Sequence, residues 1–191
     1  MIPQSDSIDF TAARMAMIDS ELRPQGIANP AVLAAMSAVP RERFVASGAE
    51  ALAYGDRGAP AANGGALIPP AAFGLLLQAL VPQAGERALV VGIDPAYAAA
   101  VLTALGVSVA TDAAAPGHYD IILIDGAVEA IPDALTDRLT PGGRLAGAID
   151  DDGVTRLIVG ARTAGAFGYT SIGDAFVPRL PGFQRPRAFV F

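Results

Sequence analysis

A single glycine follows a short apolar strand near the middle of the chain and leads into a helical segment. The strand is Ala88–Val91, the glycine is Gly92, and an alanine-rich helix is predicted over 96–105. This order is typical of nucleotide-cofactor sites, because backbone N–H groups at the helix start can bind polar groups of the ligand. Asp-Pro-Ala at 94–96 replaces the further glycines expected there, so the turn predicts either a cofactor site or the remains of one.

Other catalytic groups are scarce in this sequence. The chain has no cysteine, which excludes a disulfide framework, a thiolate metal site and a cysteine nucleophile. His118 is the only histidine, and its place beside a glycine in a connection predicts a surface residue. Asp150–Asp152 form the one dense acidic cluster, which ends at a glycine and is expected to be a solvated loop. The sequence therefore offers few side chains that could bind a catalytic metal ion.

Charge and hydropathy limit the classes of partner. The net charge is −6, and the 13 basic residues are scattered, which argues against a nucleic-acid partner because phosphate binding needs clustered cations. No apolar run approaches the ~18 residues needed to span a bilayer. Acidic residues occupy the N-terminus where a signal peptide carries basic ones. We expect a soluble, cytoplasmic protein without a membrane partner.

The elements that position the turn alternate between helix and strand. Asn29 and Pro30 suit the start of a helix that ends at Pro40, because they fit the cap and the first helical position. Strands buried on both faces of a parallel sheet lack polar alternation, as the run "DIILID" does. The predicted elements are helices over 7–22, 29–40, 71–81, 96–105 and 131–139, strands over 88–92, 107–111, 119–125 and 144–149, a turn at "TPGGR", and an antiparallel hairpin within 165–191.

These elements predict one domain, residues 1–191, of the α/β class. A helical cap is expected over 7–45 and an irregular segment rich in Gly, Ala and Pro over 46–70. The remainder, 71–191, is expected to form a Rossmann-like core with a mostly parallel sheet.

Several stretches resemble bacterial protein-L-isoaspartate O-methyltransferases in order and spacing. They are "MIDSELRPQGIANPAVLAAMSAVPRERFV", "LAYGD", "GERALVVG", "YDIILIDGA", "LTPGGRLAG" and "FVPRLPG", and they cover nearly the whole chain from about Met17 onward. The resemblance implies a Rossmann-like sheet and S-adenosylmethionine as cofactor. It also implies methylation of the carboxyl group of isoaspartyl residues in damaged proteins.

The first departure from the family lies in the cofactor turn. The family motif reads roughly Glu-Val-Gly-x-Gly-Ser-Gly-Tyr, and of its three glycines and its tyrosine only Gly92 and Tyr97 remain here. Pro95 lacks a backbone N–H, and side chains at 94 and 96 obstruct close approach of a ligand to the backbone. The resemblance also puts the Asp94 carboxylate near the carboxylate of the cofactor, although Asp94 could instead face the sulfonium.

The second departure lies in the segment "NGGALIPPAAF". The family's threonine and serine, which line the substrate site, correspond to Ala66 and Ile68. The substrate carboxylate is its own nucleophile in this methyl transfer, so the enzyme chiefly supplies proximity, orientation and exclusion of water. Loss of the hydroxyl groups therefore impairs positioning without removing a proton-transfer group.

The third departure is a deletion before the strand 119–125. The family carries a helix, a strand and an adenine-binding loop there, and only "DAAAPGH", residues 112–118, remains. A parallel crossover with a helix needs ~10 residues or more. This link therefore predicts that 107–111 becomes the edge strand of a sheet reduced by one strand, or else leaves its parallel position altogether. Asp112 corresponds to the acidic residue that binds the ribose hydroxyls in the family.

Two functions are consistent with this sequence. One is a degenerate family member that has lost cofactor binding and serves as an interaction or regulatory protein. The other is an active S-adenosylmethionine-dependent carboxyl methyltransferase, with Gly92, Asp94, Tyr97 and Asp112 as cofactor contacts. Binding of a different small ligand in the family's cofactor cleft is a third, weaker option.

The uncovered edge strand also predicts a homodimer.

Overall fold

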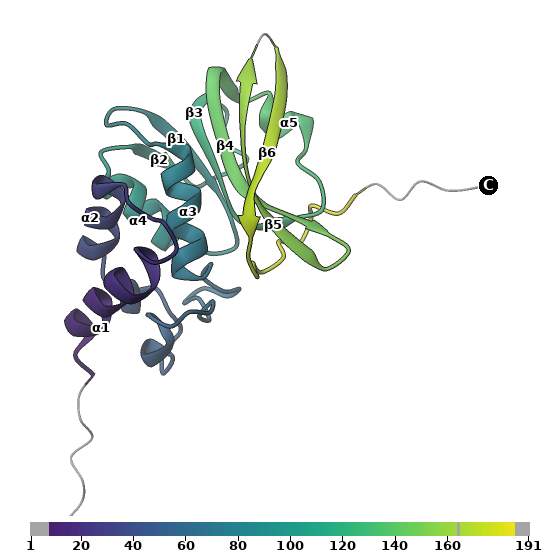
Figure 1. Cartoon of the computed structure of the whole chain (residues 1–191). Coiled ribbons are helices and arrows are strands. Elements are labelled where there is room, and N and C mark those ends of the chain that lie inside the picture. Colours follow the sequence, from purple (N-terminus) through teal and green to yellow (C-terminus); the bar gives the residue numbers. More distant parts are fainter. Residues whose placement is uncertain (1–7, 164, 186–191) are drawn as a thin grey trace, which may run out of the picture.

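A six-stranded sheet forms the centre of the molecule in a computed structural model, which describes residues 8–163 and 165–185 (Figure 1). The strand order is β2-β1-β3-β4-β5-β6. The first four strands in that order are parallel, and the last two are antiparallel to their neighbours. The bounds are β1 Arg87–Val91, β2 Ser108–Ala110, β3 Tyr119–Val128, β4 Leu139–Asp151, β5 Val154–Thr163 and β6 Ala166–Asp174.

Three of the α-helices, α1 to α3, come before β1 in the chain, and α4 and α5 connect parallel strands. Asn29 accepts hydrogen bonds from the backbone N–H groups of Ala31 and Val32, which confirms the predicted cap. Within the described ranges, no helix is both long and apolar enough to cross a membrane. The bounds are α1 Phe10–Met17, which continues into a π-helical turn Ile18–Leu22, α2 Pro30–Ala38, α3 Pro70–Leu80, α4 Ala96–Ala104 and α5 Asp133–Thr136.

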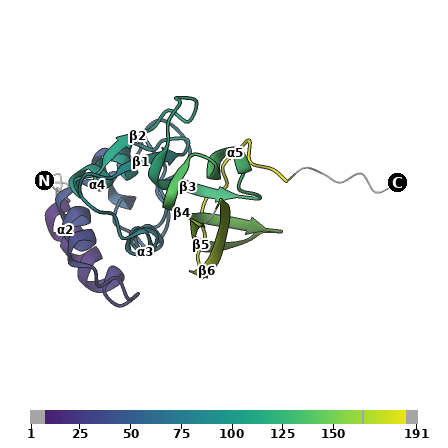
Figure 2. The ribbon, with the colours of Figure 1, turned by 90° about the horizontal axis from the view of Figure 1, so that it is seen from above.

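The two faces of the sheet are covered unequally. Ala88 and Val90 of β1 point into a large core against α1 to α4, whereas Leu89 and Val91 point into a smaller core on the opposite face. The smaller core is closed by Leu135 of α5 and by Leu180 and Phe183 of the segment that follows β6. Seen from above, α3 and α5 lie on opposite sides of the sheet (Figure 2).

The reduced, mostly parallel sheet with its antiparallel hairpin confirms the predicted fold class. β2 is the last strand at one end of the described sheet and pairs in parallel with β1. The link 112–118 contains no helix and passes β1 to reach β3 on its other side, as the short connection predicted.

Two predictions around β4 were wrong. The helix expected over 131–139 is only the four-residue α5, and β4 already begins at Leu139. The predicted "TPGG" turn is an irregularity within β4, because the pairing with β3 steps from Tyr119–Leu139 to Ile121–Arg144. Extra residues in one strand are accommodated as a bulge when flanking residues pair with the neighbouring strand.

The hairpin of the C-terminal part consists of β5 and β6, and β5 was missed. The prediction put both strands within 165–191, but no further strand follows β6 in 175–185, and 186–191 lie outside the described residues. Asp152 and Gly153 join β4 to β5 with φ angles of 51° and 94°. An Asp-Gly pair between apolar runs is a signature of a two-residue hairpin turn, and this signal could have identified β5.

Candidate functional site

A small pocket lies where β1 and β3 end, side by side in the sheet. The chain leaves β1 towards β2 and returns to β3 on the other side, and ligands of α/β sheets bind at such a switch point. The pocket has a volume of about 120 Å³. Its lining residues are Gly65, Ala66, Ile93, Asp94, Asp125, Pro178, Arg179 and Leu180.

Asp94 is buried at the start of α4 and binds the protein's own backbone. Its carboxylate accepts hydrogen bonds from the N–H of Asn63 at 2.9 Å and from the N–H of Ala96 at 3.4 Å. The second donor is at the N-terminus of a helix, where N–H groups otherwise bind anionic ligands. Asp94 therefore ties the segment around Asn63 to the N-terminus of α4.

Asp125 was not predicted as a site residue, although it lies directly against Gly92. A Cβ atom added to Gly92 would lie 3.0 Å from the Cβ of Asp125. Burial raises the pKa of Asp125 to about 7; Arg41 opposes this shift, and the neighbouring Asp94 adds to it. A carboxylate directly after the apolar run Ile121–Ile124 was the signal that could have identified it.

Tyr97 lies in the core and does not line the pocket. Its ring packs against Phe44 and Phe73, with centroid distances of 5.5 Å and 5.3 Å. The guanidinium carbon of Arg41 lies 4.7 Å from the ring centroid of Tyr97. Burial raises the pKa of the Tyr97 hydroxyl, which has no hydrogen-bond partner among the described residues. Tyr97, which matches the family motif, thus has a packing role in the core beneath the turn.

Arg41 is a buried cation that the sequence did not single out. Its Nε donates to the carbonyl of Ala53 and its Nη2 to the carbonyl of Ile68, both at 2.7 Å. Ile68 itself is buried. One of the two positions where the family has a hydroxyl is therefore part of the core, and its backbone is held in place by Arg41.

Ala66, the other of these two positions, borders two hollows. It lines the small pocket and also a groove of about 600 Å³, and Pro178 borders both as well. Leu75 and Phe176 are among the other lining residues of the groove. Phe176 is 82% exposed, so the groove offers a large apolar contact to a ligand.

Asp112 lies apart from the pocket. Its side chain is exposed and accepts a hydrogen bond from the N–H of Ala114 at 2.8 Å. The carboxylate thus closes a local turn, and Asp112 is not among the residues that line the pocket. His118 is exposed as predicted.

The expectation of a solvated acidic loop was wrong for Asp150. This residue is buried at the end of β4 and forms an ion pair with Arg179, whose Nη2 donates to its Oδ1 at 2.9 Å. The hydrogen bonds from Arg179 lower the pKa of Asp150. Asp152 is exposed, and the carboxylate of Asp150 also accepts from the N–H of Gly153 at 2.8 Å, so Asp150 stabilises the hairpin turn.

The residues at the switch point do not fit S-adenosylmethionine in this arrangement. Pockets for ligands of this size have volumes of roughly 300 to 1,000 Å³, whereas the pocket over Asp94 and Asp125 has about 120 Å³. Both side chains are acidic, so they oppose the carboxylate of the cofactor, although its ammonium and sulfonium groups carry the opposite charge. In the described part of the chain, no group of three or more His, Asp or Glu side chains could hold a metal ion.

Comparisons with known proteins identify the family. Residues 12–111 match the family model described as Protein-L-isoaspartate(D-aspartate) O-methyltransferase (PCMT). A protein-L-isoaspartate O-methyltransferase of Methylorubrum extorquens is 35% identical, with 91% of each chain covered. One of Bradyrhizobium sp. (strain ORS 278) is 32% identical, with 86% of this chain and 92% of that protein covered.

The fold is also similar to that of a solved structure. A putative protein-L-isoaspartate O-methyltransferase from Plasmodium falciparum, in complex with S-adenosyl-L-homocysteine, superposes with a TM-score of 0.73 and 16% identity. The match covers 87% of this chain and 97% of that one. The sequence motifs, the sheet topology and these relatives agree, and the chain belongs to the protein-L-isoaspartate O-methyltransferase family.

Proposed function

We propose that this chain is a non-catalytic member of the family, which does not bind S-adenosylmethionine and acts as an interaction or regulatory protein. The observation that carries the proposal is the Asp94 carboxylate, which accepts the N–H of Ala96 at the start of α4. The space left over this turn is about 120 Å³. We expect the protein to act in the cytoplasm, which cell fractionation would test.

The open groove beside Ala66 supports a polypeptide as the ligand. Its volume of about 600 Å³ is five times that of the pocket over Asp94. Exposed aromatic side chains such as Phe176 are frequent anchors of protein interfaces. The occupant is either an isoaspartyl segment or another segment of a partner protein, bound without transfer of a methyl group.

Calorimetry with S-adenosylmethionine and with its demethylated product tests the proposal. We expect no binding at ligand concentrations up to about 1 mM, a limit that corresponds to roughly −4 kcal/mol. The relative from Methylorubrum extorquens serves as the control protein. Micromolar affinity for either ligand would overturn the proposal.

The alternative function is an active carboxyl methyltransferase of isoaspartyl residues. It is favoured by the position of Ala66, which still lies between the pocket at the switch point and the groove. The chemistry needs no proton-transfer group, because proximity and orientation supply most of the rate. Release of labelled methanol after incubation with an isoaspartyl peptide and labelled cofactor distinguishes the two functions. We expect none, whereas turnover similar to that of the relative would establish the alternative.

We also propose a homodimer that pairs through β2. The strand is at the sheet edge, but it has only three residues, and Val109 packs partly against the core. An edge strand exposes unpaired backbone groups that a second copy can bind. Sedimentation at micromolar concentration should show a dimer that Val109→Lys dissociates without loss of helical signal. A monomeric wild-type chain would contradict this assembly.

A further inference from the structure

The face of the sheet that carries α5 has an open groove of about 740 Å³. The helix that lines it, α5, spans only Asp133–Thr136. In this part of the sheet β4, β5 and β6 pair antiparallel, and such sheets can leave one face open to solvent.

The floor of this groove is apolar. Ile149 of β4 and Phe167 of β6 are partly buried and pack against the smaller core. Phe167 and Tyr169 lie with their ring centroids 6.2 Å apart, and Tyr169 is 56% exposed. These side chains form a surface on which aromatic rings can stack.

The rim of the groove is acidic. Glu129, Asp133 and Asp137 line it. Asp137 pairs with Arg162 at 3.1 Å, whereas Asp133 has no ion pair among the described residues. A ligand that carries a cation next to aromatic groups would therefore match both the rim and the floor.

The described part of the chain ends on this rim. Arg185 lines the groove, its N–H donates to Oε2 of Glu129 at 3.0 Å, and its Nε donates to the carbonyl of Glu129 at 3.1 Å. Its Nη2 also contacts Asp151 at 3.2 Å. The described chain thus ends at the mouth of the groove.

We propose that the C-terminal segment 186–191, Pro-Arg-Ala-Phe-Val-Phe, occupies this groove. In an extended chain, alternate side chains share a face, so Arg187, Phe189 and Phe191 point the same way. Arg187 then meets the acidic rim, and the two rings reach the apolar floor. Six extended residues reach about 20 Å. The proposal is independent of cofactor binding.

Chemical cross-linking tests the position of the segment, because the chain has no cysteine of its own. The pair Ala166→Cys and Ala188→Cys should react within one chain with a short bismaleimide, because Ala166 lines the groove and neither substitution removes an aromatic ring. Ala51→Cys with Ala188→Cys is the matched control, because Ala51 is also exposed and lies outside the groove. Equal yields for both pairs, or a cross-link mainly between two chains, would overturn the proposal.

Binding in trans tests the chemistry of the segment. A chain that ends at Arg185 should bind a labelled Pro-Arg-Ala-Phe-Val-Phe peptide, measured by fluorescence anisotropy. The full chain should bind it at least about 10-fold more weakly, because a tethered segment competes at an effective concentration near millimolar. Tyr169→Ser in the shortened chain, or serine at both phenylalanines of the peptide, should weaken binding. Equal affinity of the shortened and full chains, or no binding to the shortened chain, would refute the assignment.

Discussion

β3 carries one carboxylate near each end, and the two have opposite environments. Asp120, near the start, accepts hydrogen bonds from the N–H of Arg87 and the hydroxyl of Thr140, both at 3.0 Å. The bond from Arg87 is the main cause of its lowered pKa. At the other end, burial raises the pKa of Asp125 to about 7. The ionised form is thus favoured at one edge of the sheet and disfavoured at the other.

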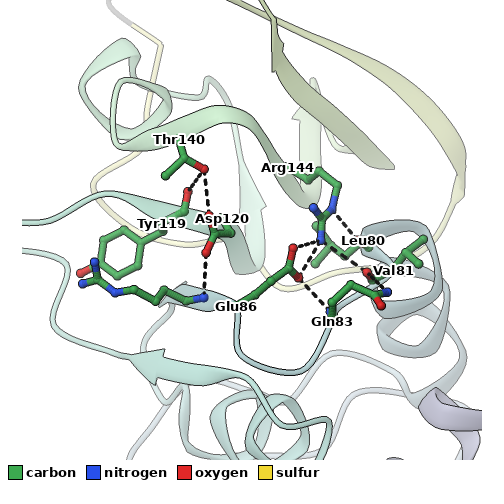
Figure 3. A network of polar contacts seen from close by, with 9 residues as sticks. Leu80, Val81, Gln83, Glu86, Tyr119, Asp120, Thr140 and Arg144 are labelled. Carbon is green, nitrogen blue, oxygen red and sulfur yellow. Dashed lines mark hydrogen bonds and ion pairs between the residues drawn. The ribbon is translucent and has the colours of Figure 1, made fainter.

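The difference separates the structural end of β3 from the end that borders the pocket at the switch point. Around Asp120, Glu86 and Arg144 form an ion pair at 2.8 Å, and Nε of Arg144 donates to the carbonyl of Leu80 at 2.7 Å (Figure 3). These bonds hold the end of α3 to β1 and β4. Carboxylates with strongly raised pKa values are more typical of ligand sites, and Asp125 lines the pocket at the switch point beside Gly92.

Arg144→Met should have the largest effect on stability. The substitution removes the ion pair with Glu86 and the bond to Leu80, and it leaves a half-buried carboxylate without its partner. We expect a loss of about 3 kcal/mol in the free energy of unfolding, measured with urea. Arg23→Met is the control, because the pair of Arg23 with Asp19 is 60% and 63% exposed and should contribute below about 0.5 kcal/mol. Similar losses for both variants would mean that the bonds of Arg144 to Glu86 and Leu80 stabilise the fold no more than an exposed ion pair does.

Asp125→Asn should stabilise the protein by roughly 1 to 2 kcal/mol at pH 8. A carboxyl group whose pKa is about 7 in the folded chain and ordinary in the unfolded chain binds its proton more tightly when folded. Its contribution to stability is present below pH ~4 and is lost as the pH rises to about 7. The asparagine variant lacks this loss, so the two unfolding curves should converge in acid. A gain that is equal at pH 4 and pH 8 would show that the pKa of Asp125 is ordinary.

Asp120→Asn should have the opposite sign and destabilise the protein by about 1 kcal/mol at pH 7. The pKa of Asp120 is lowered on folding, so its stabilising effect exists above the unfolded pKa and disappears as the pH falls through the folded value. The difference between the variant and the wild type should therefore vanish in acid. Thermal unfolding between pH 3 and pH 8 measures it, and a difference that grows in acid would contradict the assignment.

Asp112→Ala should have the smallest effect. The carboxylate bonds only to the nearby N–H of Ala114 in an exposed turn, so we expect a change below about 0.5 kcal/mol. Calorimetry on the same variant should show unchanged, absent binding of S-adenosylmethionine. Binding by the wild type that this substitution weakens would assign the residue to a working ribose site.

Local patterns in the sequence were enough to predict the frame of the fold. The helix cap at Asn29, the apolar runs of β1 and β3, and the short link 112–118 depend on neighbouring residues and chain length alone. The chain length of that link also predicted β2 as an edge strand, because seven residues cannot include a crossover helix. The family motifs themselves indicated where the switch point lies.

Tertiary structure alone decided how the side chains at that point are used. Local sequence patterns do not reveal that Asp94 bonds to Asn63, that Asp150 is buried against Arg179, or that Arg41 reaches Ile68. The two residues of each pair are far apart along the chain. Likewise, the raised pKa of Asp125 follows from burial, which depends on everything packed around it. Spacing within a strand, turn or helix is a local property of the sequence, whereas solvation and long-range hydrogen bonding exist only once the whole chain has folded.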